Sequence, residues 1–184
     1  MSEEMLVCHC SPTLAGLKTG SLFSCPYSSQ KMIIKEIREF NQKLTQKGIR
    51  IIPVRISDKR MLVYVYRPEK LKEDFSDEKT QIILKCKGYD CTNLSQCICR
   101  LIQKLQSDPD FPHEIGLFLG YPAEDVKGFI ENKAACSKCS GCWKVYGDEQ
   151  AARILFKKYK KCTRKLEESA LNEEERKKEM ALAE

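Results

Sequence analysis

Two runs of β-branched and aromatic residues restrict the fold of this chain more than any other feature of its sequence. Residues 49–56 and 61–66 are both of this kind, and the four polar residues 57–60 separate them. Two such runs joined by a short polar connection predict a β-hairpin. Pro53 lacks the backbone N–H that a central strand donates, so we expect the first strand to lie at a sheet edge or to contain a bulge.

Amphipathic helices are predicted on both sides of this hairpin. Ile33, Ile37, Phe40 and Leu44 recur at the spacing of one helical face, and Gly48 suits the end of that helix. A second stripe of the same kind consists of Leu94, Cys97, Ile98, Leu101, Ile102 and Leu105. Shorter helices are expected within residues 68–87, from Pro122 onward and from Asp148 onward.

Three further short strands are expected, at residues 6–10, 114–119 and 143–146, with a short helix or loop over residues 14–23. Helices and strands that alternate in this way predict an α/β fold. We therefore expect one α/β domain over residues 1–165, with a mixed β-sheet of about four to five strands that includes the hairpin and is packed by helices. Residues 166–184 are rich in charge and are expected to form a helical or frayed tail.

Charge and hydropathy exclude several classes of protein. The 184 residues carry a formal net charge of +6, but basic and acidic residues are mixed along the chain. This mixture is typical of a solvated surface, so nucleic acid is not an expected partner, and the basic run 157–161 is interpreted as one exposed helix face. No apolar run is long enough to cross a membrane. The first residues lack the basic start and apolar core of a signal peptide, which predicts a cytoplasmic protein.

Cysteine is the unusual component, with 11 residues in the chain. An odd number cannot pair completely within one chain, and cysteines in a reducing compartment are more often buried, metal-bound or redox-active than paired. Cys136, Cys139 and Cys142 form a C-x2-C-x2-C pattern, which can hold an iron–sulfur cluster or three corners of a zinc site. Cys162, Cys10 or His9 are candidates for the fourth ligand. The alternative is a loop whose three thiols bind nothing.

A second candidate site surrounds Cys10. Its thiol is a candidate nucleophile if a helix N-terminus or Lys18 lowers its pKa. Ser11, Thr13 and Lys18 are candidates to bind an anion. The alternative is a buried strand end without a ligand. Tyr121, between a predicted strand and a predicted helix, is a further candidate for ligand contact.

Several segments together resemble one family. They are Cys8–Lys18, Ser21–Phe23, Leu62–Pro68, Pro112–Pro122 and Trp143–Asp148. These segments are similar to the uncharacterised bacterial family DUF3793, which is common in anaerobic Firmicutes, and the resemblance covers about residues 5–165. It implies an anaerobic cytoplasm, where exposed thiols and oxygen-sensitive clusters persist, and it implies no particular activity.

Three functions remain open on the sequence. The first is binding of a metal, an iron–sulfur cluster or a redox ligand through cysteines, with a redox protein as a possible partner. The second is a thiol-dependent or anion-binding enzyme centred on residues 10–13. The third is a non-catalytic interaction protein that uses the charged C-terminal helix.

Overall fold

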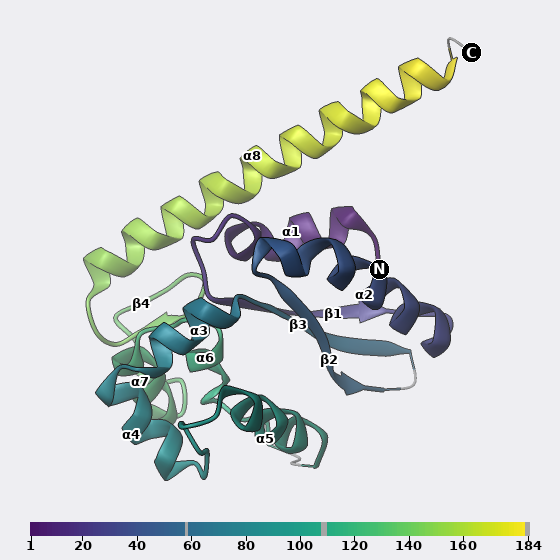
Figure 1. Ribbon diagram of the computed structural model, residues 1–184. Coiled ribbons are helices and arrows are strands. Elements are labelled where there is room, and N and C mark those ends of the chain that lie inside the picture. The colour runs from purple at the N-terminus through teal and green to yellow at the C-terminus, as the bar shows by residue number, and fades with distance from the viewer. Residues whose placement is uncertain (58, 108–109, 183–184) are drawn as a thin grey trace.

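The fold is known from a computed structural model, which describes residues 1–57, 59–107 and 110–182, with side chains up to residue 172. It is a three-layer arrangement in which helices cover both faces of a small sheet (Figure 1). The elements are α1 (Glu3–Leu14), β1 (Gly20–Pro26), α2 (Gln30–Leu44), η1 (Thr45–Lys47), β2 (Arg50–Ile56), β3 (Arg60–Tyr66), α3 (Pro68–Phe75), α4 (Glu78–Cys86), α5 (Leu94–Ser107), α6 (Ile115–Phe118), α7 (Ala123–Asn132), β4 (Cys139–Ser140), β5 (Lys144–Val145) and α8 (Glu149–Leu182).

The predicted hairpin is present and forms two of the three strands of the main sheet. The strand order is β1-β3-β2, and both pairings are antiparallel. The register of β2 shifts between Pro53 and Arg55, and β2 lies at the sheet edge. Pro53 therefore occupies an edge strand with an irregularity beside it, as its missing N–H requires.

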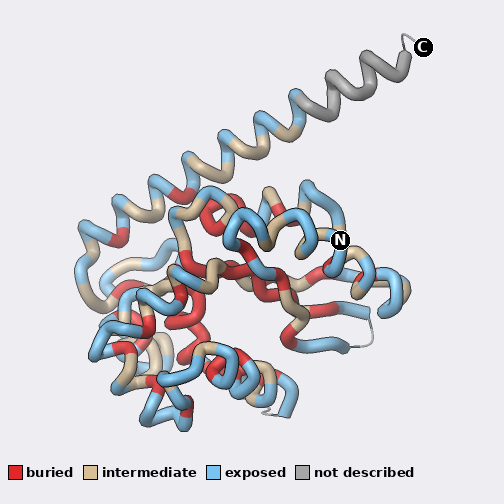
Figure 2. Tube along the Cα trace, viewed as in Figure 1, coloured by how far each residue is buried: buried red, intermediate tan, exposed pale blue. Residues whose placement is uncertain are grey.

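The central strand β3 divides the core between the two faces of the sheet. Met61, Val63 and Val65 are fully buried beneath α1 and α2. Tyr64 and Tyr66 alternate with them and pack on the opposite face, beneath α3, α5 and α6. This alternation is the period-2 pattern of a strand. Because both faces carry helices, β3 is apolar on both sides, and Figure 2 shows the buried residues concentrated along the sheet.

The predicted amphipathic helices are confirmed. Ile33 and Ile37 of α2 are buried against the sheet, and Gly48 ends this region with a φ of 71°. The α5 stripe buries Cys97, Ile98, Leu101 and Leu105. Residues 68–87 contain two helices, α3 and α4. The α8 helix begins where Asp148 accepts the Ala151 amide at 3.0 Å, which is the expected N-cap.

The strand predicted at residues 6–10 is wrong, because these residues belong to helix α1. Ser2 caps this helix by accepting the Met5 amide at 3.3 Å, and Leu6 and Cys10 are buried on one face at a helical spacing. Pro12 lies in the last turn of the helix. Proline removes only one hydrogen bond there, so its presence did not exclude a helix.

The secondary structure predicted for two more segments differs from the observed one. Residues 114–119 were predicted as a strand, but Ile115–Phe118 is the short helix α6, and its residues are all buried. A short apolar run fits a buried strand and a buried helix equally well. Residues 20–23 were predicted as helix or loop and instead begin β1. Within the described ranges the main sheet is therefore a three-stranded antiparallel one, not a mixed sheet of four to five strands.

A separate two-stranded sheet joins the second half of the chain to α8. Strands β4 and β5 pair antiparallel, with Cys139 opposite Val145. Trp143 and Val145 pack with Ala152 and Tyr159 of α8 in a small core of their own. Further along, α8 lies beside α1 and then extends past the body of the protein (Figure 1). No described helix is long and apolar enough to cross a membrane.

Candidate thiol site

Four segments that are distant in sequence meet beside the β4–β5 hairpin. Lys18 lies between α1 and β1, and its Nζ atom is 5.1 Å from the centre of the Tyr121 ring. Tyr121 follows α6 and donates its hydroxyl to the Cys142 carbonyl at 3.4 Å. Tyr159 of α8 donates to the Leu17 carbonyl at 3.5 Å. The site therefore combines an amine, a thiol and two phenols.

Trp143 is the centre around which the aromatic side chains of this site pack. Its ring stacks on Tyr121 at 4.7 Å and meets Phe156 edge-on at 4.6 Å. The turn between β4 and β5 approaches α8 so closely that a Cβ at Gly141 would lie 2.3 Å from the Phe156 ring. Offset and edge-on ring pairs of this kind add to the stability that burial supplies.

Asp125 fixes the end of the hairpin to the start of α7. Its carboxylate is buried and accepts three hydrogen bonds, from Trp143 Nε1 at 2.7 Å, from the Tyr146 amide at 2.7 Å and from the Gly147 amide at 2.8 Å. A carboxylate with three donors holds its neighbours more firmly than neutral hydrogen bonds do. Asp125 therefore determines where Trp143, and with it Cys142, is held.

The turn that presents Tyr121 depends on a glycine. Gly120 has a φ of +74°, and a Cβ at this position would lie 2.6 Å from Thr19 Oγ1. Thr19 in turn donates to Asp74 at 2.5 Å. Glycine adopts this left-handed backbone without steric cost and leaves room for Thr19. The segments that carry Lys18 and Tyr121 can approach each other for this reason.

Lys18 and Cys142 influence each other electrostatically. Burial lowers the pKa of the Lys18 amine, and the neighbouring Cys142 and Cys10 thiols oppose that shift. Burial raises the pKa of the Cys142 thiol, and Lys18 is the strongest opposing influence. Each charged form is thus disfavoured by burial and favoured by the other charge. No ion pair joins Lys18 to a carboxylate within the residues that the structure describes.

The two phenols beside this pair are neutral at physiological pH. Burial raises the pKa of Tyr121 to about 12, and a negative charge on Cys142 acts in the same direction. Tyr159 is shifted to about 12 for the same two reasons, with Asp74 adding to the effect. Both hydroxyls therefore remain hydrogen-bond donors near the thiol.

Tyr121 and Trp143 also line a pocket of about 420 Å³. Apolar side chains form most of its wall, including Phe111, Ile115, Val126 and Phe129. Cys142 and His113 are among its lining residues, and the His113 ring meets Phe129 edge-on at 5.0 Å. A pocket of this size with a few polar groups is typical of a small-molecule site.

The residues around Cys10 lie in helix α1 and are buried, as in the alternative without a ligand. Cys10 is fully buried, and burial raises its pKa to about 12. Ser11 is buried and donates to the Val7 carbonyl. Thr13 is buried and shares a hydrogen bond of 2.9 Å with Ser21. These thiol and hydroxyl groups are enclosed and engaged within the core, so of this predicted group only Lys18 belongs to the thiol site.

The three cysteines of the C-x2-C-x2-C pattern are spread along the hairpin. Cys136, with a φ of 57°, and Cys142, in the turn, are both exposed, and Cys139 lies half-buried in β4. No three Cys, His, Asp or Glu side chains in the described part of the chain are grouped as metal ligands. Of the candidates for a fourth ligand, Cys162 donates to the Ser11 carbonyl at 3.6 Å, and His9 is exposed and stacks on Phe23. A metal or cluster on these thiols stays a prediction.

Comparison with known families decides where this chain belongs. The model of the family described as "Protein of unknown function (DUF3793)" matches residues 6–180, which is nearly the whole chain. The chain belongs to the DUF3793 family. No curated protein and no solved structure matches it. Three of the segments that resemble DUF3793, around Lys18, Tyr121 and Trp143, are those that meet at the thiol site.

The sequence predicts most residues of this site as candidates, but it does not predict that they lie together. Lys18, Tyr121 and Cys142 were each candidates, assigned to three different sites. Asp125 was not singled out, because an acidic residue in the first turn of a helix already suits the helix dipole. Its role depends on Trp143, 18 residues further along the chain, and no local pattern connects the two.

Proposed function

We propose that this protein is thiol-dependent, with Cys142 as the reacting group and Lys18 as the cation that stabilises its thiolate. The ligand would be a small, mostly apolar molecule with an electrophilic centre, bound in the pocket beside Trp143. The observation that carries the proposal is a half-buried lysine over the Tyr121 ring, whose hydroxyl binds the backbone of Cys142, a residue that lines an apolar pocket.

The chemistry of the pair supports this assignment. A thiol reacts as its thiolate, and a nearby cation favours that form. The Tyr121 and Tyr159 hydroxyls are protonated, and they donate to the backbone carbonyls of Cys142 and Leu17. Attack by the thiolate on a carbonyl carbon would form a sulfur–carbon bond and break the carbonyl π bond, whose electron pair passes to the oxygen; that oxygen then takes a proton from the Lys18 ammonium or from solvent. The thiol proton is taken up by solvent or by a neutral Lys18 amine.

The proposal can be tested with two alkylating reagents that differ only in an aromatic group. Iodoacetamide and N-benzyl-iodoacetamide both form a thioether and release iodide, and mass spectrometry reports the rate at each cysteine. Cys136 is exposed on the same hairpin and serves as the internal reference. The pocket predicts that the benzyl reagent favours Cys142 over Cys136 by about five-fold or more relative to iodoacetamide, because the ring is buried.

A pair of variants makes the test specific to the pocket. Phe111 is 43% exposed and lines the pocket, so Phe111→Ala should remove much of the benzyl preference without unfolding the protein. Ile82 is 57% exposed and lies elsewhere, so Ile82→Ala should leave it unchanged. An equal benzyl effect at Cys136 and Cys142, insensitive to Phe111→Ala, would contradict the proposal.

A further inference from the structure

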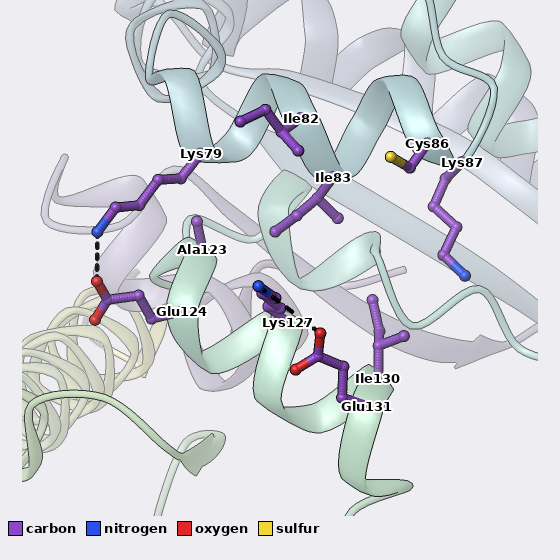
Figure 3. Close-up of a pocket in the computed structure, with 10 residues that line it drawn as sticks. All are labelled: Lys79, Ile82, Ile83, Cys86, Lys87, Ala123, Glu124, Lys127, Ile130 and Glu131. Atoms are coloured by element: carbon purple, nitrogen blue, oxygen red, sulfur yellow. Dashed lines mark hydrogen bonds and ion pairs between the residues drawn. The ribbon is translucent and has the colours of Figure 1, made fainter.

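A second groove lies between α4 and α7, away from the thiol site. It has a volume of about 510 Å³, and Figure 3 shows its lining residues. Ile82 and Ile83 of α4 and Ala123 and Ile130 of α7 supply its apolar surface. Ile82 is 57% exposed. An apolar strip of this kind on a protein surface indicates a binding site more often than an isolated exposed residue does.

The charges around this groove are distributed unequally between its two ends. At one end Lys79 and Glu124 join α4 to α7 through an ion pair of 2.5 Å (Figure 3). On the side of α7, Lys127 pairs with Glu131 at 3.8 Å. Lys87 lines the other end of the groove, and it also borders a neighbouring pocket that contains Lys104, Asp110 and Glu114. The groove therefore has an ion pair between its two helices at one end and a lysine at the other.

We infer that this groove binds an amphiphile with one anionic head group and an unbranched apolar chain, such as a medium-chain fatty acid. The carboxylate would lie at Lys87, and the chain would run over Ile83 and Ile130 toward the Lys79–Glu124 ion pair. The eight residue steps from Lys79 to Lys87, at the end of α4, span about 12 Å, which suits an extended chain of the length of decanoate. The proposal goes beyond the thiol site and does not depend on it.

Isothermal titration of the full-length protein with decanoate, below its micelle concentration, tests this inference. We expect saturable binding of one decanoate per chain, and weaker binding of decanol, which lacks the charge. Lys87→Glu should weaken decanoate binding by about five-fold or more, since it replaces an attraction with a repulsion. Lys85→Glu makes the same change on α4 outside the lining of the groove and should leave the affinity unchanged.

A second variant tests the apolar part of the site. Ile82→Glu introduces a charge at an exposed position, so the fold should persist while decanoate binding is lost. The inference is overturned if decanoate does not bind, or if Lys85→Glu and Lys87→Glu weaken binding equally. It is also overturned if Ile82→Glu changes the oligomeric state and not the affinity for decanoate, because the groove would then be a surface for another protein chain.

Discussion

Replacing Asp125 should loosen the β4–β5 hairpin and release Cys142 from its position beside Lys18. The Asp125 carboxylate is 3% exposed and accepts hydrogen bonds from one indole and two backbone amides, all between 2.7 and 2.8 Å. Asp125→Ala removes the acceptor and leaves three donors without a partner. Hydrogen bonds to a charged group contribute about 1.5–3 kcal/mol each, and partial opening of the hairpin to water recovers part of the loss.

We therefore expect Asp125→Ala to lower the free energy of unfolding by about 3–5 kcal/mol. Asp125→Asn keeps one acceptor oxygen and should cost about 1–3 kcal/mol, because its amide group cannot accept on both sides. Trp143→Phe removes a single donor and should cost a similar amount. Since these residues share a hydrogen bond, the double variant with Asp125→Ala should lose less than the sum of the two single losses.

Urea unfolding monitored by circular dichroism measures these differences, and alkylation of Cys142 reports on the site itself. In Asp125→Ala, the rate at which Cys142 reacts with iodoacetamide should no longer depend on Lys18. The reasoning is refuted if Asp125→Ala stays within about 0.5 kcal/mol of the unmodified protein, the range of an ordinary surface substitution, and if Cys142 keeps its original reactivity.

Three further changes should alter stability in defined directions. Burial raises the pKa of the Cys10 thiol from 9.0 to about 12, so its contribution to the free energy of unfolding is complete below pH 9 and falls by about 1.4 kcal/mol per pH unit as the pH rises toward 12. Urea unfolding from pH 8.5 to 10.5 should therefore show a shallower decline of this free energy in Cys10→Ala, and equal slopes would contradict the prediction. Ala134 has a φ of 67°, so Ala134→Gly should raise the thermal midpoint through about 0.5–1 kcal/mol of relieved strain, whereas a lower midpoint would show that no strain is stored there. Gly120→Ala should cost at least about 1 kcal/mol in urea unfolding, because the new Cβ meets Thr19 at 2.6 Å, and an unchanged stability would exclude that clash.

The parts of the fold that the sequence predicted are those in which a long local pattern repeats. The hairpin and helices α2 and α5 each bury one regular stripe or alternating face, and their periodicity is visible without knowledge of the rest of the chain. The segments α1 and α6 were assigned to strands because each is short. Cys8 to Pro12 combines β-compatible residues with a proline, and only burial of Leu6 and Cys10 against the sheet selects the helix.

The candidate site was less predictable because it is assembled from four segments by packing. Lys18 meets Tyr121 only because Gly120 allows a close approach to Thr19, and Cys142 is held there only because Asp125 binds Trp143. The sequence marked these side chains as chemically interesting but contained no periodicity that links them. The C-x2-C-x2-C pattern also predicts Cys142 as a metal ligand, whereas in the structure the Lys18 amine is the cation that influences its pKa.

The pH dependence of Cys142 alkylation tests the pairing with Lys18 most directly. Iodoacetamide rates at Cys142 would be measured by mass spectrometry in the unmodified protein and in Lys18→Met, Lys18→Arg and Lys158→Met, the last an exposed control on α8. Lys18 opposes the rise in the pKa of Cys142, so Lys18→Met should move the rate profile to higher pH, while Lys18→Arg and Lys158→Met keep it in place. Identical profiles in the unmodified protein and in Lys18→Met would contradict a thiol site built on this pair.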